Sequence, residues 1–303
     1  MPRKEGSVVN EFKTYHPIVN FTYFVLVIGF SCFFMHPLCL CISLVCGFTY
    51  SVMLKGKKAI KTNLIYMLPM MFLTALINPL FNHEGATVIA YFSSGNLLTL
   101  ESIIYGLCAA TMIVSVICHF SCFNEVMTSD KFIYLFGKII PALSLIISMT
   151  LRFVPKFLAQ LKVVINAQKC MGRDLSSGNI IKRAKHGLNI LSIMVTWSLE
   201  NAIDTADSMK ARGYGIKGRT AFSIYTFDKR DKKALVCILI LGIYTFIGSL
   251  IGGMYFAFFP TIKTVDLSLF SASVFCSYLL LCMCPLIIEL WEVRRWKALM
   301  SKI

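Results

Sequence analysis

The amino-acid sequence predicts an all-α, polytopic membrane protein with about six transmembrane helices, and three observations support this fold class. First, 57% of the 303 residues are hydrophobic and only 15% are charged, whereas soluble domains average about 45–50% apolar and about 25% charged residues. Second, six apolar runs are long enough, or nearly so, to cross a bilayer as helices. Third, the basic residues gather between alternate runs, as Lys and Arg do on the cytoplasmic side of membrane proteins.

A helix that crosses a bilayer needs about 17–25 residues. The six predicted spans cover residues 18–35, 38–54, 64–81, 102–123, 234–255 and 267–290. The first two are short and are joined by a tight turn at His36-Pro37. A seventh apolar run, 132–150, contains Lys138 and Pro141. A seventh crossing would place the two termini on opposite sides of the membrane, or would divide the basic segment 124–233 between the two sides. We therefore predict that this run forms a helix that lies at the interface or inserts shallowly without spanning.

The position of the charges predicts the topology. Six crossings place 29 of the 30 Lys and Arg residues on one side, and 18 of these lie in residues 124–233. The positive-inside rule assigns that side to the cytoplasm. We therefore predict a multi-pass protein of the cell membrane with both termini cytoplasmic. The formal net charge of +15 is then mainly a topology signal. The bilayer is the expected partner of part of this charge, and nucleic acid is not an expected partner.

Three regions follow from this topology: N-terminal membrane helices (1–123), a cytoplasmic helical insert (124–233), and C-terminal membrane helices with a basic tail (234–303). The insert has a net charge of +10. It is the only large segment predicted to lie outside the membrane, so it is the expected place for contacts with cytoplasmic partners.

Two amphipathic helices are predicted in the insert. Apolar residues recur at spacings of three and four over 151–165, which is typical of one helix face. Pro155 is expected to bend or restart this helix, and Gly172 to end it. A second apolar stripe runs unbroken over 188–209 and stops at Gly213. We expect this second helix to be buried at its start and exposed at its end.

Each of these helices ends in a glycine with a basic residue beside it, and the two glycines are 41 residues apart. One interpretation is plain capping, because a cation at a helix C-terminus gains about 0.3–1 kcal/mol from the helix dipole. The other is a pair of docking points, because an amphipathic helix anchored by an arginine is a common protein–protein contact. The pattern alone leaves both interpretations open.

Several segments resemble signatures of the transmembrane (T) component of energy-coupling-factor transporters, the EcfT/CbiQ-like family. The segments are AQKCMG at 167–172, SMKARGYG at 208–215, NPLFNH at 78–83, LRFVP at 151–155 and SGN at 177–179. The similarity covers nearly the whole chain. The segment 208–215 is the most specific, and the N-terminal third is matched mainly by hydropathy.

The resemblance implies a non-catalytic coupling subunit. In this family the T component joins a substrate-binding membrane protein, the S component, to two cytoplasmic ABC-type ATPases, for uptake of vitamins or of metal ions such as cobalt. Each of two coupling helices ends in an Ala-Arg-Gly-like triplet that docks into one ATPase. The resemblance carries this coupling role in full to the second triplet, Ala211, Arg212 and Gly213. In the first helix it carries the role to Cys170, Met171, Gly172 and the following Arg173. There the arginine before the glycine is missing, so Arg173 or Lys169 would supply the charge from another helical position.

The other sequence motifs do not predict a catalytic, cofactor-binding or metal-binding site. Residues 213–218 fit G-x-G-x-x-G and residues 213–220 nearly fit a Walker A loop, but both motifs need a preceding strand and the sequence predicts a helix there. We therefore expect ATP hydrolysis to belong to partner subunits. Gly248 and Gly252 have the spacing that lets membrane helices approach closely. Packing within the chain is the expected role of this pair, with contact to an S component as the alternative.

Two other functional classes stay open from the sequence. One is an integral membrane enzyme acting on lipid or isoprenoid substrates, which would need clustered carboxylates or histidines near the interface. Glu200, Asp204 and Asp207 are instead spread along a helix flank. The other is an ordinary ABC permease, which would bind substrate itself and need no S component.

Overall fold

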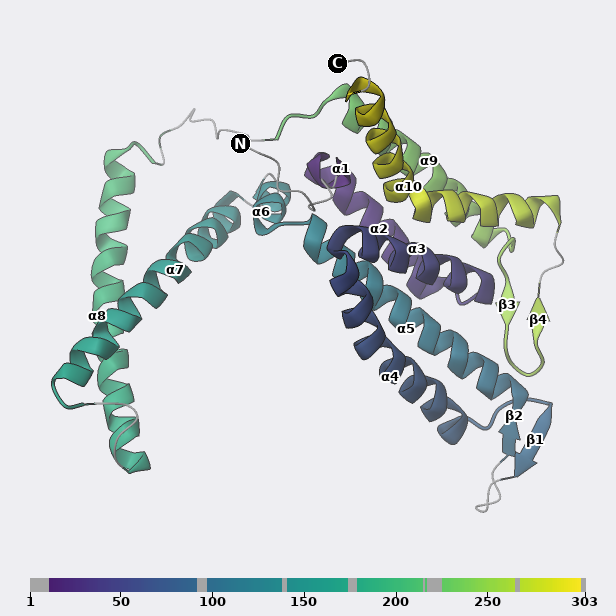
Figure 1. The fold of residues 1–303 in the computed structure, drawn as a ribbon, viewed down its shortest axis with the longest axis horizontal. Helices are drawn as coiled ribbons and strands as arrows, with labels where there is room; N and C mark the ends of the chain where they lie inside the picture. The colour runs from purple at the N-terminus through teal and green to yellow at the C-terminus, as the bar shows by residue number, and fades with distance from the viewer. Residues whose placement is uncertain are drawn as a thin grey trace. The chain divides into compact units, whose positions relative to one another are not determined.

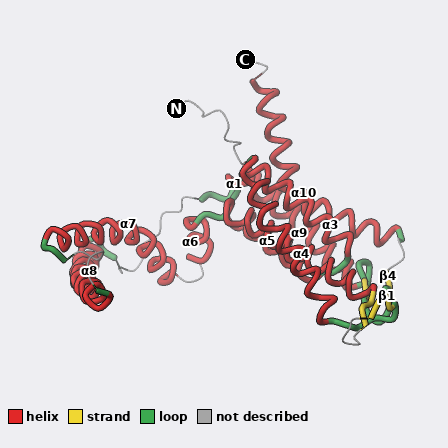
Figure 2. Tube along the Cα trace, turned by 60° about the horizontal axis from the view of Figure 1, so that its bottom comes forward, coloured by secondary structure: helices red, strands yellow, loops and turns green. Residues whose placement is uncertain are grey.

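The structure is a computed structural model that describes residues 11–91, 97–137, 141–173, 179–214, 216, 225–264 and 268–300. Most of the described chain is helical (Figures 1 and 2). It divides into two compact units. The membrane unit comprises Met1–Phe132 and Tyr225–Ile303, and the insert unit comprises Ile133–Ile224.

The membrane unit contains the predicted spans. Its helices are α1 (Glu11–Thr14), α2 (Pro17–Phe33), α3 (Pro37–Lys55), α4 (Lys57–Phe81), α5 (Leu100–Val126), α9 (Lys229–Leu250) and α10 (Leu269–Met300). Among the described residues, five helices are long and apolar enough to cross a membrane: α3, α4, α5, α9 and α10. Helix α2 is also apolar but has only 17 residues, the lower limit for a crossing. The all-α, multi-pass membrane fold is therefore confirmed, with a short first span.

Histidine-proline pairs start the first two of these helices. The His16 and His36 rings accept hydrogen bonds from the backbone N–H two residues on, at 3.3 and 3.2 Å. A proline takes the first helical position in each case, where its missing N–H costs nothing and its φ already suits a helix. The predicted turn at His36 is thus a helix N-cap.

Helix α9 ends five residues earlier than predicted, at Leu250 instead of residue 255. Gly252 adopts a left-handed φ of 95°, and Gly253 N–H bonds back to the Gly248 carbonyl at 2.9 Å, which terminates the helix. The predicted glycine pair on one helix face is therefore wrong. Only Gly248 lies in the helix, where an added Cβ would come within 2.6 Å of Val274 Cγ2 in α10.

Two small hairpins lie at one end of the membrane unit (Figure 1). Strand β1 (Val88–Tyr91) pairs antiparallel with β2 (Leu97–Thr99), and β3 (Phe256–Ala257) pairs with β4 (Lys263–Thr264). The Ala86 N–H donates to the Pro260 carbonyl at 3.0 Å. The loops after α4 and α9 therefore lie on the same side, as expected from an even number of crossings between them.

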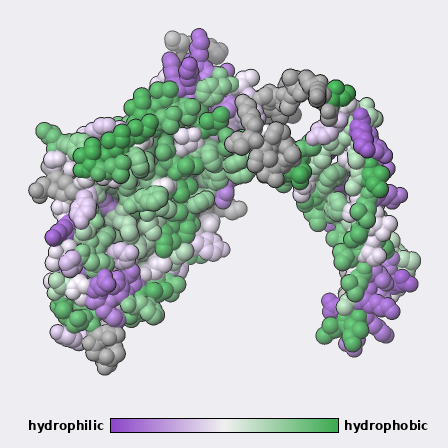
Figure 3. All heavy atoms as spheres, turned by 180° about the vertical axis from the view of Figure 1, so that it is seen from behind, coloured by the Kyte–Doolittle hydropathy of each residue, from purple (hydrophilic) through white to green (hydrophobic). Residues whose placement is uncertain are grey.

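Hydrogen bonds join the helices inside the membrane unit. Ser43 Oγ of α3 lies 2.6 Å from Ser31 Oγ of α2, 2.7 Å from Ser115 Oγ of α5, and 3.0 Å from His119 Nε2 of α5. All four side chains are buried. In the bilayer such bonds hold helices together where apolar contact with lipid is equally favourable. The outer surface of this unit is mainly hydrophobic in the view of Figure 3, and hydrophilic residues gather at its two ends, one of which is the C-terminal end of α10.

The apolar run 132–150 covers the end of α6 (Ser129–Gly137) and the beginning of α7 (Pro141–Cys170). Residues 138–140, with Lys138, lie outside the described part of the chain, so the prediction that this run forms one helix stays a prediction. Helix α7 continues through Pro155, so this proline does not restart the helix, and the bend expected there as the alternative stays a prediction. Helix α7 is not among the described helices that are long and apolar enough to cross a membrane.

Candidate functional site

The insert unit is built around two long helices, α7 and α8 (Ile180–Ala211), that pack antiparallel. The rings of Phe157 and Trp197 meet edge to face at 5.2 Å, and Lys156 Nζ donates to Asn201 Oδ1 at 2.6 Å. Val164, closer to the end of α7, packs in one cluster with Ile190, closer to the start of α8. The C-terminal ends of the two helices therefore lie at opposite ends of the pair (Figure 1).

The packed face of α8 differs from the predicted one. The buried residues are Ile190 and Met194, which lie in the first half of the predicted stripe, as expected. Helix α8 begins eight residues before that stripe, at Ile180, which is 79% exposed. Most of the predicted stripe faces away from α7: these exposed side chains, here called the α8 stripe, are Leu188, Leu191, Val195 and Leu199. The cause is that α8 is apolar on more than one face, and only one face can meet α7.

The end of α7 is a left-handed glycine cap. Gly172 has a φ of 73°. The Arg173 N–H bonds to the Gln168 carbonyl at 3.0 Å, and the Gly172 N–H bonds to the Lys169 carbonyl at 3.0 Å. This pair of bonds is the Schellman motif, which satisfies carbonyls that a helix end would otherwise leave unpaired. An added Cβ at Gly172 would meet no atom within 4 Å, so the glycine is required by the backbone conformation and not by space.

The end of α8 repeats the same arrangement. Gly213 has a φ of 76°. The Tyr214 N–H bonds to the Met209 carbonyl at 3.0 Å, and the Gly213 N–H bonds to the Lys210 carbonyl at 2.9 Å. The prediction that both helices end at these glycines is confirmed. The two ends, Cys170–Arg173 and Ala211–Tyr214, are here called the first and second caps.

The two caps match in backbone but differ in charge. Arg212 stands directly before the left-handed glycine, and the residue at that position in the first cap is Met171. Arg173 stands after its glycine, at the position that Tyr214 holds in the second cap. The side chains of Met171, Arg173 and Arg212 are all exposed. Each cap therefore presents an accessible helix end, and only the second presents an arginine at the cap position itself.

The glycine-rich motif after α8 follows a helix and not a strand. Gly213 is the terminator of α8, and residues 215 and 217–220 lie outside the described part of the chain, as do residues 177 and 178 of the SGN segment. In the described residues no group of three or more His, Cys, Asp or Glu side chains is placed to hold a metal ion.

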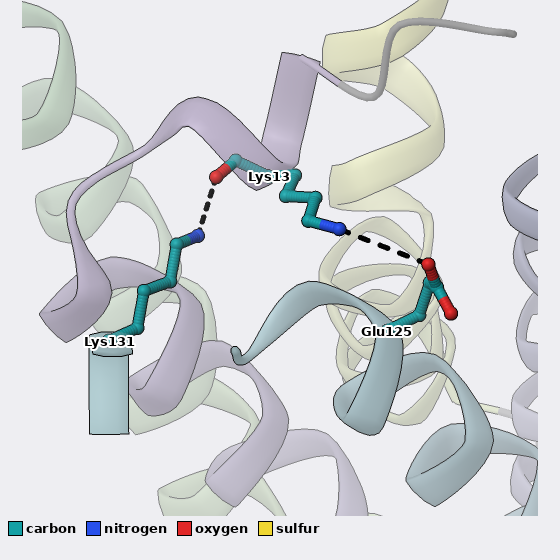
Figure 4. A network of polar contacts seen from close by, with 3 residues as sticks. All are labelled: Lys13, Glu125 and Lys131. Carbon is teal, nitrogen blue, oxygen red and sulfur yellow. Dashed lines mark hydrogen bonds and ion pairs between the residues drawn. The ribbon is translucent and has the colours of Figure 1, made fainter. Parts of the chain in front are cut away.

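The chain leaves the membrane unit at a polar network that sequence reasoning missed (Figure 4). Lys131, in the first turn of α6, donates from Nζ to the Lys13 backbone carbonyl. Lys13 Nζ in turn lies 3.9 Å from Glu125 Oε1 in the last turn of α5. Lys131 is 5% exposed, so burial, with the Lys13 charge as a second cause, lowers its pKa to about 8. From the sequence alone, these three charged residues could be assigned only to the side of the membrane on which most basic residues lie.

The chain returns to the membrane unit against the same N-terminal segment. The His16 N–H donates to Asp231 Oδ1 at 3.3 Å. The Arg230 guanidinium lies 4.3 Å from the centre of the Tyr15 ring and donates to Thr14 Oγ1 at 3.1 Å. Residues 11–16 therefore contact both the segment where the chain leaves the membrane unit and the segment where it returns. These contacts fix the two attachment points of the insert relative to each other.

Comparison with known proteins gives one family and several relatives. Residues 10–222 match the CbiQ family, described as cobalt transport protein. The chain is similar to proteins named energy-coupling factor transporter transmembrane protein EcfT. It is 39% identical to that of Lactobacillus helveticus over 100 residues, which cover 33% of this chain and 36% of the relative. It is 36% identical to that of Streptococcus equi subsp. equi over 105 residues (34% and 39%). It is 37% identical to that of Acidaminococcus fermentans over 123 residues (39% and 45%). The matched stretch thus spans less than half the length of these relatives.

Proposed function

Because the chain belongs to the CbiQ family of cobalt transport proteins, and with it to the T components of energy-coupling-factor transporters, we propose that it couples two cytoplasmic ABC-type ATPases to a membrane-embedded S component. The chain itself is non-catalytic in this proposal. It passes the movement of the ATPases, driven by ATP, to the S component, which binds a vitamin or a metal ion. Both termini and the region 124–233 lie in the cytoplasm.

The observation that carries this proposal is the repetition of one cap at opposite ends of one helix pair. Two ATPases of like fold need two docking points of like shape, and the first and second caps share their backbone hydrogen bonds and their left-handed glycine. The coupling residues are Cys170, Met171, Gly172 and Arg173 in the first cap and Ala211, Arg212 and Gly213 in the second. An arginine fork suits this role because it bonds carboxylate or carbonyl oxygens at two points.

The exposed α8 stripe indicates that an apolar surface of a partner protein covers this face of α8. Four large apolar side chains on one helix face are unusual on a surface that meets only water. We propose that the S component, or an ATPase groove, covers this face in the assembled transporter. The S component determines which substrate is carried, so the substrate is set outside this chain.

Charge reversal at the second cap tests the proposal. A tagged chain is co-expressed with its ATPases and candidate S components, purified in mild detergent, and the bound chains are identified. Arg212→Glu is expected to lose one ATPase while the chain still inserts in the membrane, because it places a carboxylate where the fork docks. Lys210→Glu is the matched control, since it reverses a charge in the last turn of the same helix. Arg173→Glu is expected to have a smaller effect than Arg212→Glu.

The same purification separates the other functional classes. Two ATPases together with a small hydrophobic protein support the proposal. ATPases without any such protein, combined with transport by this chain and the ATPases alone, would identify an ordinary permease. Absence of ATPases from the wild-type preparation would contradict both and leave the membrane enzyme.

A further inference from the structure

A groove of about 680 Å³ lies between α9 and α10, at the end of the membrane unit where α9 begins. A second hollow of about 630 Å³ adjoins it along α9. The two share four lining residues spaced four apart, Lys229, Lys233, Cys237 and Leu241. Residues at this spacing form one row on a helix face. This row is the wall that the two hollows have in common, and the groove between α9 and α10, which runs along the whole row, is here called the α9 groove.

The lining of the α9 groove changes from charged to apolar along the helix axis. Its beginning carries Lys229, Arg230 and Lys233 from α9 and Arg295 from α10, and the carboxylate among its lining residues is Glu292. Its deeper part is lined by apolar side chains and thiols: Cys237, Leu241, Leu280, Cys284, Ile287 and Ile288. The row from Lys229 to Leu241 extends about 18 Å at the rise of an α-helix. This length covers a phosphate group and a good part of an acyl chain.

Two aromatic rings hold the arginines at the charged end. The Arg230 guanidinium lies 4.3 Å from the centre of the Tyr15 ring, and the Arg295 guanidinium lies 5.5 Å from that of Trp291. Both rings line the groove. Stacking on a ring restrains a guanidinium while leaving N–H groups for a phosphate oxygen. Tyr and Trp are also the residues that favour the headgroup level of a bilayer, which places the charged end of the groove at the membrane surface.

We propose that the α9 groove binds an anionic phospholipid from the leaflet that α9 enters at Lys229. The phosphate lies among Lys229, Lys233 and Arg295, and an acyl chain follows the row towards Leu241. Four cations against one carboxylate favour an anionic headgroup over a zwitterionic one, which would add its own cation to the cluster. A free phosphate ion would leave the apolar part of the groove empty. This inference depends on the membrane location of the chain and goes beyond its proposed coupling function.

Trp291 makes the proposal directly measurable. The full-length chain with Trp197→Phe and Trp296→Phe keeps Trp291 as its only tryptophan. It is reconstituted in phosphatidylcholine vesicles that contain a minor fraction of phosphatidylglycerol with brominated acyl chains, which quench tryptophan on contact. The comparison vesicles contain the same fraction of brominated phosphatidylcholine. We expect much stronger quenching by phosphatidylglycerol.

The paired lysines provide the matched comparison. Lys229→Gln with Lys233→Gln is expected to reduce the preference for phosphatidylglycerol roughly tenfold, the equivalent of about 1.4 kcal/mol. Lys57→Gln with Lys61→Gln removes two lysines at the same spacing from the first turns of α4 and is expected to keep the preference. Cys237→Phe fills the groove without a change of charge and is expected to lower quenching.

Four results would overturn the proposal. One is equal quenching by the two brominated lipids. Another is an equal loss of preference in the two lysine pairs, which would indicate general surface charge. The third is recovery of Trp291 fluorescence with an excess of glycerol phosphate, which would indicate a site for phosphate alone. A Cys237→Phe chain that elutes as a monodisperse species but is quenched as strongly as the parent would also contradict it.

Discussion

Lys131 Nζ donates a hydrogen bond to the backbone carbonyl of Lys13, which joins the first turn of α6 to α1 across 118 residues of sequence. Asn20, with its amide turned to satisfy both of its neighbours, accepts from the same Nζ at 2.8 Å and donates to the Phe12 carbonyl at 3.0 Å. The Lys131 amine therefore has hydrogen-bond partners within the protein but little contact with water. Burial lowers its pKa from 10.5 to about 8, and the Lys13 charge contributes in the same direction.

This shift predicts a pH dependence of stability. Between about pH 8 and pH 10.5 the unfolded chain binds more protons at this site than the folded chain, so the free energy of unfolding rises with pH in that window. Below it both states are protonated and the contribution is constant. Lys131→Gln keeps a donor for the Lys13 carbonyl and removes the titration. We expect the wild type to gain thermal stability relative to Lys131→Gln as the pH rises through this window.

Lys57→Gln is the control for that experiment, since this exposed lysine at the start of α4 lies outside the network of Lys13, Glu125 and Lys131. Thermal unfolding in one detergent, followed by intrinsic fluorescence, gives the difference between each variant and the wild type at each pH. A difference for Lys131→Gln that stays constant across the window would show that the folded-state pKa is not lowered.

The contact of Gly248 with Val274 predicts a strong steric effect between α9 and α10. An alanine Cβ at position 248 would lie 2.6 Å from Val274 Cγ2 and 2.9 Å from Cγ1, which forces the helices apart. Gly248→Ala is expected to destabilise the unit by about 1–3 kcal/mol. Val274→Ala in the same chain is expected to recover part of this loss, which a double-mutant cycle of unfolding measures. Gly29→Ala in α2 is the matched control, because no atom lies within 4 Å of its added Cβ.

The membrane helices could be predicted from the sequence because each is an apolar run with a recognisable start or stop. The turn at His36 marked the second helix, and the basic residues marked the side on which each loop lies. The end of α9 was misjudged because hydropathy does not fall at the glycines that terminate it, Gly252 and Gly253. Hydropathy measures preference for lipid, whereas the end of a helix depends on backbone conformation.

In the insert, the glycines predicted both helix ends but not the packed face. The α8 stripe has ideal helical spacing, yet Ile190 and Met194 make the contact with α7. A helix with two apolar faces does not reveal from its own sequence which face a given neighbour covers. The network of Lys13, Glu125 and Lys131 could not be predicted either, because it depends on how distant segments meet in space.

The cap glycines predict a substitution pattern that separates conformation from space. At Gly172 the left-handed φ of 73° disfavours alanine by about 1–2 kcal/mol, and no neighbour obstructs a side chain. Gly172→Ala is expected to speed amide hydrogen exchange in the last turn of α7 roughly five- to thirtyfold, the equivalent of that cost. Asparagine tolerates this conformation, so Gly172→Asn is expected to stay close to the wild type. Similar exchange rates in the two variants would show that conformation is not the requirement.

The two caps also predict where an added arginine strengthens docking. Met171 holds in the first cap the position that Arg212 holds in the second, so Met171→Arg gives the first cap an arginine directly before its left-handed glycine. In an Arg173→Ala background this change is expected to raise the amount of ATPase that stays bound through a high-salt wash. A charge-assisted hydrogen bond contributes about 1.5–3 kcal/mol. Met171→Gln in the same background is the control, since it adds a polar side chain without the fork. Loss of ATPase in Arg173→Ala that Met171→Arg fails to restore would instead show that Arg173 docks from its own position after the glycine.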